Sequence, residues 1–244
     1  MRLRRIDEPA IAAAANMARD EALLLADDTA ALRLYGWSPH AVSLGYFQRI
    51  ADFADLAPET SIVRRLTGGG AIHHGEEVTY ALALPAAALP ADVEASYALL
   101  HDAVLAALAD VGVRAHRLLT GGGPGARPSS RWCFADPGRH DIVDAEGRKL
   151  CGSAQRRVRT QHGPRVLHHG SIVVERPSFT PFVAAVVDQQ AASCATPLRE
   201  RLATRIADAL RMELCPDGLT TAEDALAATL RRDRYDHDAH TRMR

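Results

Sequence analysis

Apolar residues recur along the chain with two different spacings, and these spacings outline the expected elements. Alternation of apolar and polar positions is typical of strands, whereas recurrence every three or four residues is typical of helices. We expect strands at 32–37, 41–47, 61–66, 71–74, 78–84, 113–118, 141–143, 149–156 and 166–174. The helical spacing predicts helices at 6–26, 51–56, 94–111, 179–188, 198–214 and 221–232.

Turn residues indicate how these elements are connected. Ser38-Pro39 separates the first two expected strands, which favours a hairpin-like pair. Strands mixed with helices, joined by hairpins as often as by crossovers, are typical of the α+β class. We therefore expect a mixed or antiparallel β-sheet flanked by helices. Residues 1–214 would form this domain, and residues 215–244 a helical tail.

Residues 120–130 form the one strongly irregular stretch, rich in glycine, proline and serine. The stretch is too short for a domain linker, and it leads directly into Trp132-Cys133-Phe134. Irregular segments beside a fixed scaffold often carry binding residues. We expect a mobile loop next to a functional site.

Composition narrows the class of protein. The 244 residues are 47% apolar and 24% charged, with a net charge of -1, which is ordinary for a globular domain. Near neutrality argues against nucleic-acid or membrane-surface partners. No run approaches the roughly 20 apolar residues of a membrane span, and charged residues interrupt the N-terminal alanine-rich stretch. We expect a cytoplasmic protein.

The basic residues are unusual, because Lys149 is the single lysine beside 28 arginines. Arginine stays charged and forks, whereas lysine is a compact ammonium whose pKa responds to its surroundings. Small residues follow Lys149 at Gly152 to Ala154, so another backbone or a ligand can approach closely. The alternative is that the composition has drifted towards arginine and that Lys149 remains by chance.

Four cysteines are present without a CxxC spacing, which leaves little support for a structural zinc site. In a reducing cytoplasm we expect free thiols. Cys151 alternates with Lys149 along one expected strand, so both would face the same side. Cys133 follows the glycine-rich stretch. Either thiol could have Lys149 as the cation that favours a thiolate, and the residues alone leave both open.

Gly68-Gly69-Gly70 follows an expected strand and two arginines, but it matches neither a phosphate loop nor a dinucleotide fingerprint. It is either a tight turn or a backbone wall against an extended ligand. The pairs His73-His74 and His168-His169 lack the i, i+4 spacing of helical metal ligands, so we expect no metal site.

Three segments, in this order, resemble signatures of the lipoate–biotin protein ligase superfamily. Arg64 to His74 is similar to its RRxTGGxAxxH motif, Gly147 to Gln155 to its GRKxxGSAQ motif, and Leu167 to Ile172 to its LQHGSI strand. Two further segments resemble octanoyltransferases of the LipM type. Glu77-Val78-Thr79-Tyr80 is similar to their ELTYS segment, and Cys133 to Pro137 to the CFExP segment that carries their acyl-thioester cysteine.

The resemblance implies a ligase-like catalytic domain, with Cys133 and Lys149 as the catalytic pair and Cys151 as a packing residue. An octanoyl group would pass from acyl carrier protein, through a thioester on Cys133, to a lysine of a lipoyl-carrier domain. That acceptor would be the glycine cleavage H protein or a 2-oxoacid dehydrogenase E2 component. No metal or cofactor is implied. The implied substrate-binding residues are Arg64, Arg65, Gly68, Gly69, Gly70, His74, Tyr80, Gly152, Ser153, Ala154, His169 and Gly170.

Two other functions remain compatible with these motifs. The first is an ATP- and Mg²⁺-dependent lipoate–protein ligase, in which Lys149 contacts an acyl-adenylate and Cys133 is incidental. The second is a non-catalytic relative that binds acyl groups or carrier proteins.

Overall fold

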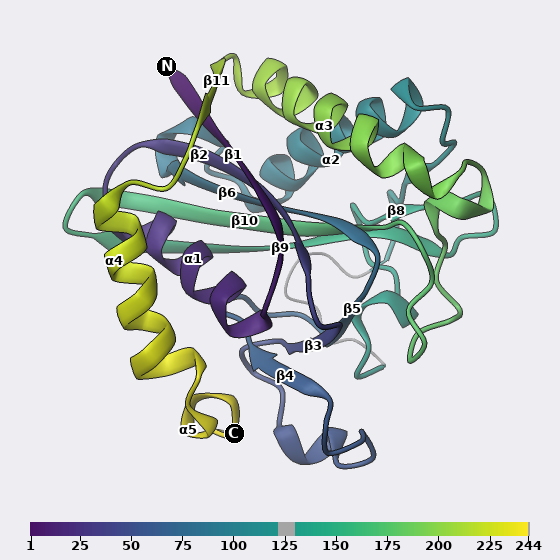
Figure 1. Cartoon of the computed structure of the whole chain (residues 1–244). Helices are drawn as coiled ribbons and strands as arrows, with labels where there is room; N and C mark the ends of the chain where they lie inside the picture. The colour runs from purple at the N-terminus through teal and green to yellow at the C-terminus, as the bar shows by residue number, and fades with distance from the viewer. Residues whose placement is uncertain (122–129, 244) are drawn as a thin grey trace.

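The computed structural model describes residues 1–121 and 130–243, which form two sheets and several helices (Figure 1). The larger sheet has the spatial order β11 (Glu213–Asp217), β1 (Arg2–Ile11), β2 (Ala30–Trp37), β6 (Glu77–Pro85), β10 (Gly163–Val173), β9 (Lys149–Thr160), β8 (Ile142–Val143) and β7 (His116–Arg117). Strand β1 runs parallel to β2 and β11, whereas the other pairs are antiparallel. The smaller sheet has the order β4 (Ser61–Arg64), β3 (Ala41–Leu44) and β5 (Ile72–His74).

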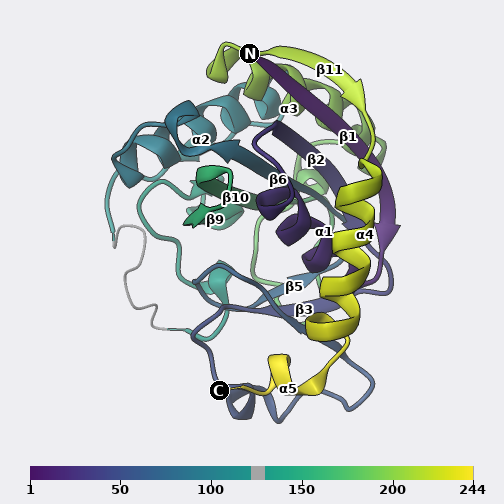
Figure 2. The ribbon, with the colours of Figure 1, turned by 90° about the vertical axis from the view of Figure 1, so that its left-hand side faces the viewer.

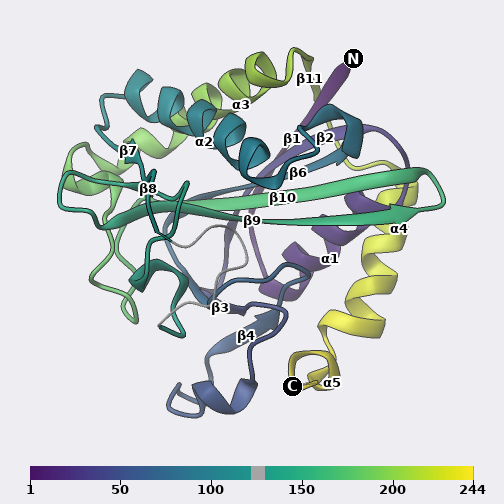
Figure 3. The same ribbon diagram turned by 180° about the vertical axis from the view of Figure 1, so that it is seen from behind.

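Helices cover both faces of the larger sheet (Figures 1 and 3). The α-helices are α1 (Ala13–Leu25), α2 (Val93–Asp110), α3 (Ala195–Leu210), α4 (Thr221–Leu230) and α5 (Asp238–Thr241). Single helical turns are η1 (Ile50–Phe53), η2 (Ala86–Ala88), η3 (Cys133–Ala135), η4 (Val186–Asp188), η5 (Ala192–Cys194) and η6 (Arg231–Tyr235). The prediction of a mixed sheet flanked by helices is confirmed. None of the helices described is long and apolar enough to cross a membrane.

Alternation along the central strands decides what each face of the sheet does. On β2, Leu32 and Leu34 pack against the layer of α2 and α3, where Leu100 and Leu202 complete the main core. Arg33 and Tyr35 point to the opposite face, toward α1 and the smaller sheet. The first face is therefore apolar core, while the second combines apolar and polar side chains and holds the candidate site.

The predicted helix at 6–26 is wrong in its first part. Residues Arg2–Ile11 form β1, and the helix begins only at Ala13. Leu3 is buried in the main core, whereas Arg4 points to the other face and binds Glu223 and Asp217. Because Arg4 occupies a buried strand position and Arg2 and Arg5 flank the apolar residues, the apolar alternation of a strand is hidden.

The predicted hairpin of 32–37 with 41–47 is also wrong. Strand β2 pairs with β1 and β6 in the larger sheet, whereas β3 is the central strand of the smaller sheet. The Ser38-Pro39 turn therefore carries the chain from one sheet to the other. This crossing brings Ser43 opposite the polar face of the larger sheet.

Three other predictions need correction. Residues 179–188 form turns with only the short η4, because Val183 to Val186 are buried on all sides and Ala184 N–H donates to Lys149 O. The strand predicted at 113–118 is confined to β7. The helix predicted at 198–214 ends at Leu210. The mobile loop expected at 120–130 falls mostly on residues 122–129, which lie outside the described residues.

The boundary expected at residue 214 falls inside β11, which pairs with β1 at the edge of the larger sheet. Helix α4 then returns along α1, as Figure 2 shows from the side. Arg4 on β1 joins this segment to the sheet through Glu223, at 2.6 Å. Residues 215–244 are thus held by β1 and α1, and Arg64 of β4 also binds Thr241 O at 2.7 Å.

Buried histidines should make the fold sensitive to mild acid. Burial lowers the pKa of His74, His101 and His168 below that of a free histidine. The unfolded chain therefore binds more protons below about pH 6.5, and stability falls as the pH drops. One proton changes the free energy of unfolding by at most about 1.4 kcal/mol per pH unit.

We expect the free energy of unfolding, measured by urea titration, to decrease between pH 7 and pH 5. His168→Leu should make this decrease shallower, because one buried ring no longer resists protonation. His162→Gln, at an exposed position, is the matched control and should leave the slope unchanged. An unchanged slope in His168→Leu would contradict this account.

Candidate active site

Gly70 and Ala71 fix the backbone of Cys133. Ala71 accepts a hydrogen bond from Cys133 N–H at 2.8 Å, and its own N–H donates to Arg131 O at 2.7 Å. Gly70 leaves the space for this approach, because a Cβ there would lie 2.7 Å from Cys133 N. The glycine run therefore determines where the thiol of η3 is placed.

Lys149, at the start of β9, meets this thiol. Its Nζ lies 3.3 Å from Cys133 Sγ, 3.3 Å from Cys133 O and 2.7 Å from Asp141 Oδ2. It also lies 4.9 Å from the centre of the Phe134 ring, a cation–π distance. The lysine side chain is only 3% exposed, so the carboxylate and the aromatic face replace the water that an ammonium would otherwise bind.

The charge on Lys149 is held by its partners. Burial alone would lower the pKa of Lys149, but Asp141 and Cys133 outweigh it and raise that pKa above its usual value. The lysine is therefore a permanent ammonium at neutral pH. An ammonium in contact with a sulfur stabilises negative charge that develops on that sulfur.

Gly152 is required for this arrangement. A Cβ on Gly152 would lie 2.2 Å from Lys149 Cε and 2.5 Å from Lys149 Nζ. A register irregularity where β9 pairs with β8 puts one extra residue into β9. As a result Leu150 and Cys151 both enter the main core, while Lys149 turns to the side of Gly152.

The prediction that Cys151 and Lys149 face the same side is therefore wrong. Cys151 is fully buried among apolar side chains, and burial raises the pKa of its thiol. A buried thiol of raised pKa is a poor nucleophile. All four cysteines are free thiols, and Cys133 is the one that contacts Lys149.

Cys133 lies in the wall of a cavity between the two sheets. Ten of the expected substrate-binding and catalytic residues line it with Trp37 and Tyr35, namely Arg65, Gly68, Gly69, His74, Cys133, Gly152, Ser153, Ala154, His169 and Gly170. Met17, Ile72 and Ala154 add apolar surface, whereas Ser43, Thr79 and Ser171 add hydroxyl groups. The lining therefore combines apolar surface with hydroxyl, imidazole and guanidinium groups.

Arg64, Gly70 and Tyr80, also expected at the substrate, do not line the cavity. Arg64 donates to the backbone carbonyls of Gly45, Gln48 and Thr241. Neighbouring strand residues face opposite sides, so Arg65 and Thr79 reach the cavity and Arg64 and Tyr80 do not. Tyr80 instead fills the space beside Gly170, where a Cβ would lie 2.6 Å from the ring.

Arg65 joins the glycine run to the smaller sheet. Its guanidinium donates to Ser43 O at 2.9 Å, Gly68 O at 2.8 Å and Gly70 O at 2.7 Å. The side chain is buried, which lowers its pKa. The two predicted arginines therefore bind different backbone carbonyls. Arg65 binds those of Ser43 and the glycine run, whereas Arg64 binds those of other segments.

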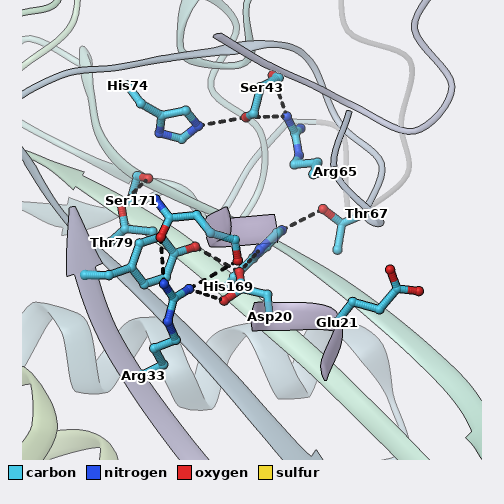
Figure 4. Close-up of polar contacts among 12 residues, drawn as sticks. Asp20, Glu21, Arg33, Ser43, Arg65, Thr67, His74, Thr79, His169 and Ser171 are labelled. Carbon is cyan, nitrogen blue, oxygen red and sulfur yellow. Dashed lines mark hydrogen bonds and ion pairs between the residues drawn. The ribbon is translucent and has the colours of Figure 1, made fainter. Parts of the chain in front are cut away.

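His169 ends a second polar network on the same face of the sheet (Figure 4). Its Nε2 lies 2.7 Å from Thr67 Oγ1 and its Nδ1 lies 3.4 Å from Asp20 Oδ2. Asp20 is also bound by Arg33 at 2.8 Å and Tyr35 at 2.8 Å. These contacts outweigh burial and lower the pKa of Asp20.

Sequence reasoning missed several residues of the site, above all Asp141, Asp20, Ser43 and Trp37. A buried lysine needs a carboxylate partner, and this requirement was the one available signal for Asp141. The others come from elements whose packing was not evident from the sequence. Among the described residues, no group of three His, Cys, Asp or Glu side chains could hold a metal ion.

A family model for the lipoyl protein ligase A/B catalytic domain matches residues 12–222. The chain belongs to this family. It is 34% identical to the octanoyltransferase LipM of Kyrpidia tusciae over 89% of this chain and 90% of that protein. A putative lipoate protein ligase from T. acidophilum superposes with a TM-score of 0.81, at 21% identity and over 100% of both chains. Lipoate-protein ligase A bound with ATP gives 0.78, at 21% identity and over 99% of both chains.

Gly152→Ala should separate Lys149 from Cys133 without removing either group. We expect alkylation of Cys133 by iodoacetamide at pH 7 to slow by about tenfold, because the displaced ammonium no longer stabilises negative charge on the reacting sulfur. Peptide mass spectrometry resolves Cys133 from the other thiols. Gly218→Ala is the matched control, since a Cβ there meets no atom within 4 Å. Equal alkylation of Cys133 in the Gly152→Ala variant and the wild type would refute the steric argument.

Proposed function

We propose that this protein is an acyltransferase that moves an octanoyl group from acyl carrier protein to a lysine of a lipoyl-carrier domain. The observation that carries the proposal is the contact of Lys149 Nζ with Cys133 Sγ, 3.3 Å apart, at a cavity with apolar and polar walls. The match to octanoyltransferase LipM over nine-tenths of that relative supports the same reaction.

In the first half-reaction, Cys133 attacks the carbonyl carbon of the octanoyl thioester as a thiolate. A new carbon–sulfur bond forms, and the phosphopantetheine thiolate of the carrier leaves and takes a proton from solvent. The ammonium of Lys149 stands next to the attacking sulfur, where it also stabilises the negative oxygen of the tetrahedral intermediate. Asp141 keeps that ammonium in place.

In the second half-reaction, the amine of the acceptor lysine attacks the thioester on Cys133. An amide bond forms, the carbon–sulfur bond breaks, and Cys133 is regenerated. Two half-reactions through a covalent intermediate give ping-pong kinetics. The energy of the donor thioester drives the transfer, so the proposed reaction needs no cofactor. The H protein of glycine cleavage or an E2 component of a 2-oxoacid dehydrogenase would be the acceptor.

An ATP-dependent lipoate ligase is the second candidate. The observation that favours it is the likeness of the fold to lipoate-protein ligase A bound with ATP. In that reaction ATP and Mg²⁺ would activate free lipoate as an adenylate, and Cys133 would not take part. The two candidates therefore differ in their need for ATP and in their need for a thiol.

Octanoyl transfer from octanoyl-acyl carrier protein to H protein should proceed without ATP and stop in Cys133→Ala. Intact-protein mass spectrometry of H protein measures the product. Cys151→Ala is the matched control and should retain activity, because that thiol lies in the core. Product formation that needs ATP and free octanoate or lipoate, and that survives Cys133→Ala, would establish the ligase instead.

A further inference from the structure

The second half-reaction has a requirement that the Cys133–Lys149 pair does not meet. A lysine side chain is an ammonium at neutral pH, with an ordinary pKa of about 10.4, and an ammonium cannot attack a thioester. It must first lose a proton to a base near the acyl group. Lys149 cannot be that base, because Asp141 holds it as an ammonium.

Ser43, His74 and Glu77 form a hydrogen-bonded row at the cavity. His74 Nε2 lies 2.7 Å from Ser43 Oγ, and His74 Nδ1 lies 2.8 Å from Glu77 Oε1. Ser43 comes from β3, His74 from β5 and Glu77 from β6, so the row joins the smaller sheet to the larger one. Figure 4 shows Ser43 between His74 and Arg65. Ser43 and His74 both line the cavity that Cys133 lines.

The partners of Glu77 fix the direction of these hydrogen bonds. Glu77 Oε1 also accepts hydrogen bonds from Ser171 Oγ at 2.7 Å and from Thr79 Oγ1. Burial would raise the pKa of Glu77, but the contacts with His74, Thr79 and Ser171 outweigh it and lower that pKa. An ionised carboxylate only accepts, so His74 Nδ1 carries the hydrogen and Nε2 is the acceptor. Ser43 therefore donates its hydroxyl hydrogen to His74.

Within residues 1–121 and 130–243, this assignment leaves Ser43 Oγ with one accepting position open for a ligand. A hydroxyl has one hydrogen to donate and two positions that accept. Ser43 donates to His74 and accepts from the Arg65 guanidinium at 3.2 Å. Its second accepting position suits an N–H donor in the cavity. The arrangement has the order hydroxyl, imidazole and carboxylate that serves proton transfer in hydrolases.

The surroundings keep the imidazole in this state. Trp37 stacks on His74 with ring centres 3.7 Å apart, which fixes the ring plane and excludes water from one side. Burial lowers the pKa of His74 although Glu77 opposes it, so the ring is uncharged at neutral pH and able to accept a proton. Glu77 then compensates the imidazolium that forms.

We propose that Ser43, His74 and Glu77 form a proton relay that deprotonates the acceptor lysine in the second half-reaction. The inference rests on the proposed acyl transfer through Cys133. The ammonium gives one proton to Ser43 Oγ while the Ser43 hydrogen moves to His74 Nε2. The neutral amine attacks the thioester, and its second proton goes to the Cys133 sulfur as the carbon–sulfur bond breaks. His74 finally releases its proton to water.

The other histidine of the cavity is less suited to this task. His169 Nε2 is bonded to Thr67, which does not line the cavity, and its carboxylate Asp20 is already shared with Arg33 and Tyr35. His73, next to His74, points to the opposite side of β5 and accepts from Phe179 N–H at 3.1 Å. His73 therefore provides a matched control.

Octanoyl-enzyme, prepared from octanoyl-acyl carrier protein, allows the second half-reaction to be measured alone. We would compare its rate with H protein and with hydroxylamine, which is largely unprotonated at neutral pH and needs no base to become a nucleophile. His74→Asn and Ser43→Ala should each lower the ratio of the H-protein rate to the hydroxylamine rate by about a hundredfold. His73→Asn should leave this ratio unchanged.

Each other outcome overturns the relay. An equal fall of both rates would mean that the row only maintains the shape of the cavity. A fall of the ratio in His169→Asn but not in His74→Asn would assign the proton to His169. An octanoyl ester on Ser43, resistant to neutral hydroxylamine, would make Ser43 a second nucleophile. Failure to form any octanoyl-enzyme would instead refute the proposed function itself, which separates the two claims.

Discussion

The candidate site is built around one buried ion pair, Lys149 with Asp141. Taking an ammonium out of water is costly unless a carboxylate and further polar contacts compensate it. Asp141 supplies the charge, Cys133 a sulfur and a carbonyl, and Phe134 an aromatic face. These few contacts must all be made by the ammonium at once, so they fix its position in the space that Gly152 leaves open.

The same constraint explains why distant segments have to meet. Gly70 admits the backbone of Cys133, and Gly152 admits the side chain of Lys149. Arg65 ties the glycine run to Ser43, and Ser43 leads to His74 and Glu77. One cavity is thus lined by the thiol that contacts the cation and by Ser43 and His74 of the hydroxyl–imidazole–carboxylate row. Under the proposed function, these two groups serve the two half-reactions.

The sequence predicted the central strands well, because Val78 to Leu84 are apolar at nearly every position and Val166 to Val173 begin and end with apolar pairs. It failed where charges occupy buried strand positions, as Arg4 does in β1. The motifs brought Arg65, His74, Cys133 and Lys149 together as candidates. They could not show that Arg65 and Thr79 face the cavity while Arg64 and Tyr80 do not. The side that each residue faces depends on how the strands pair and how the two sheets pack.

Asp141, Ser43 and Glu77 show what spacing along the chain could not predict. Ser43 and His74 are thirty-one residues apart and meet only because β3 pairs with β5. The extra residue in β9 reversed the expected relation of Cys151 to Lys149. Such register irregularities arise from packing against the neighbouring strand, so alternation along one segment does not reveal them.

The central claim is that Lys149 prepares Cys133 to carry the acyl group. Its most direct test is rapid-quench mass spectrometry of the protein mixed with octanoyl-acyl carrier protein, comparing the wild type with Lys149→Arg. The account predicts a hydroxylamine-labile octanoyl adduct on the Cys133 peptide, forming at least about tenfold more slowly in the variant, a loss of roughly 1.4 kcal/mol of transition-state stabilisation. An adduct on another residue, or equal rates in the two proteins, would contradict it.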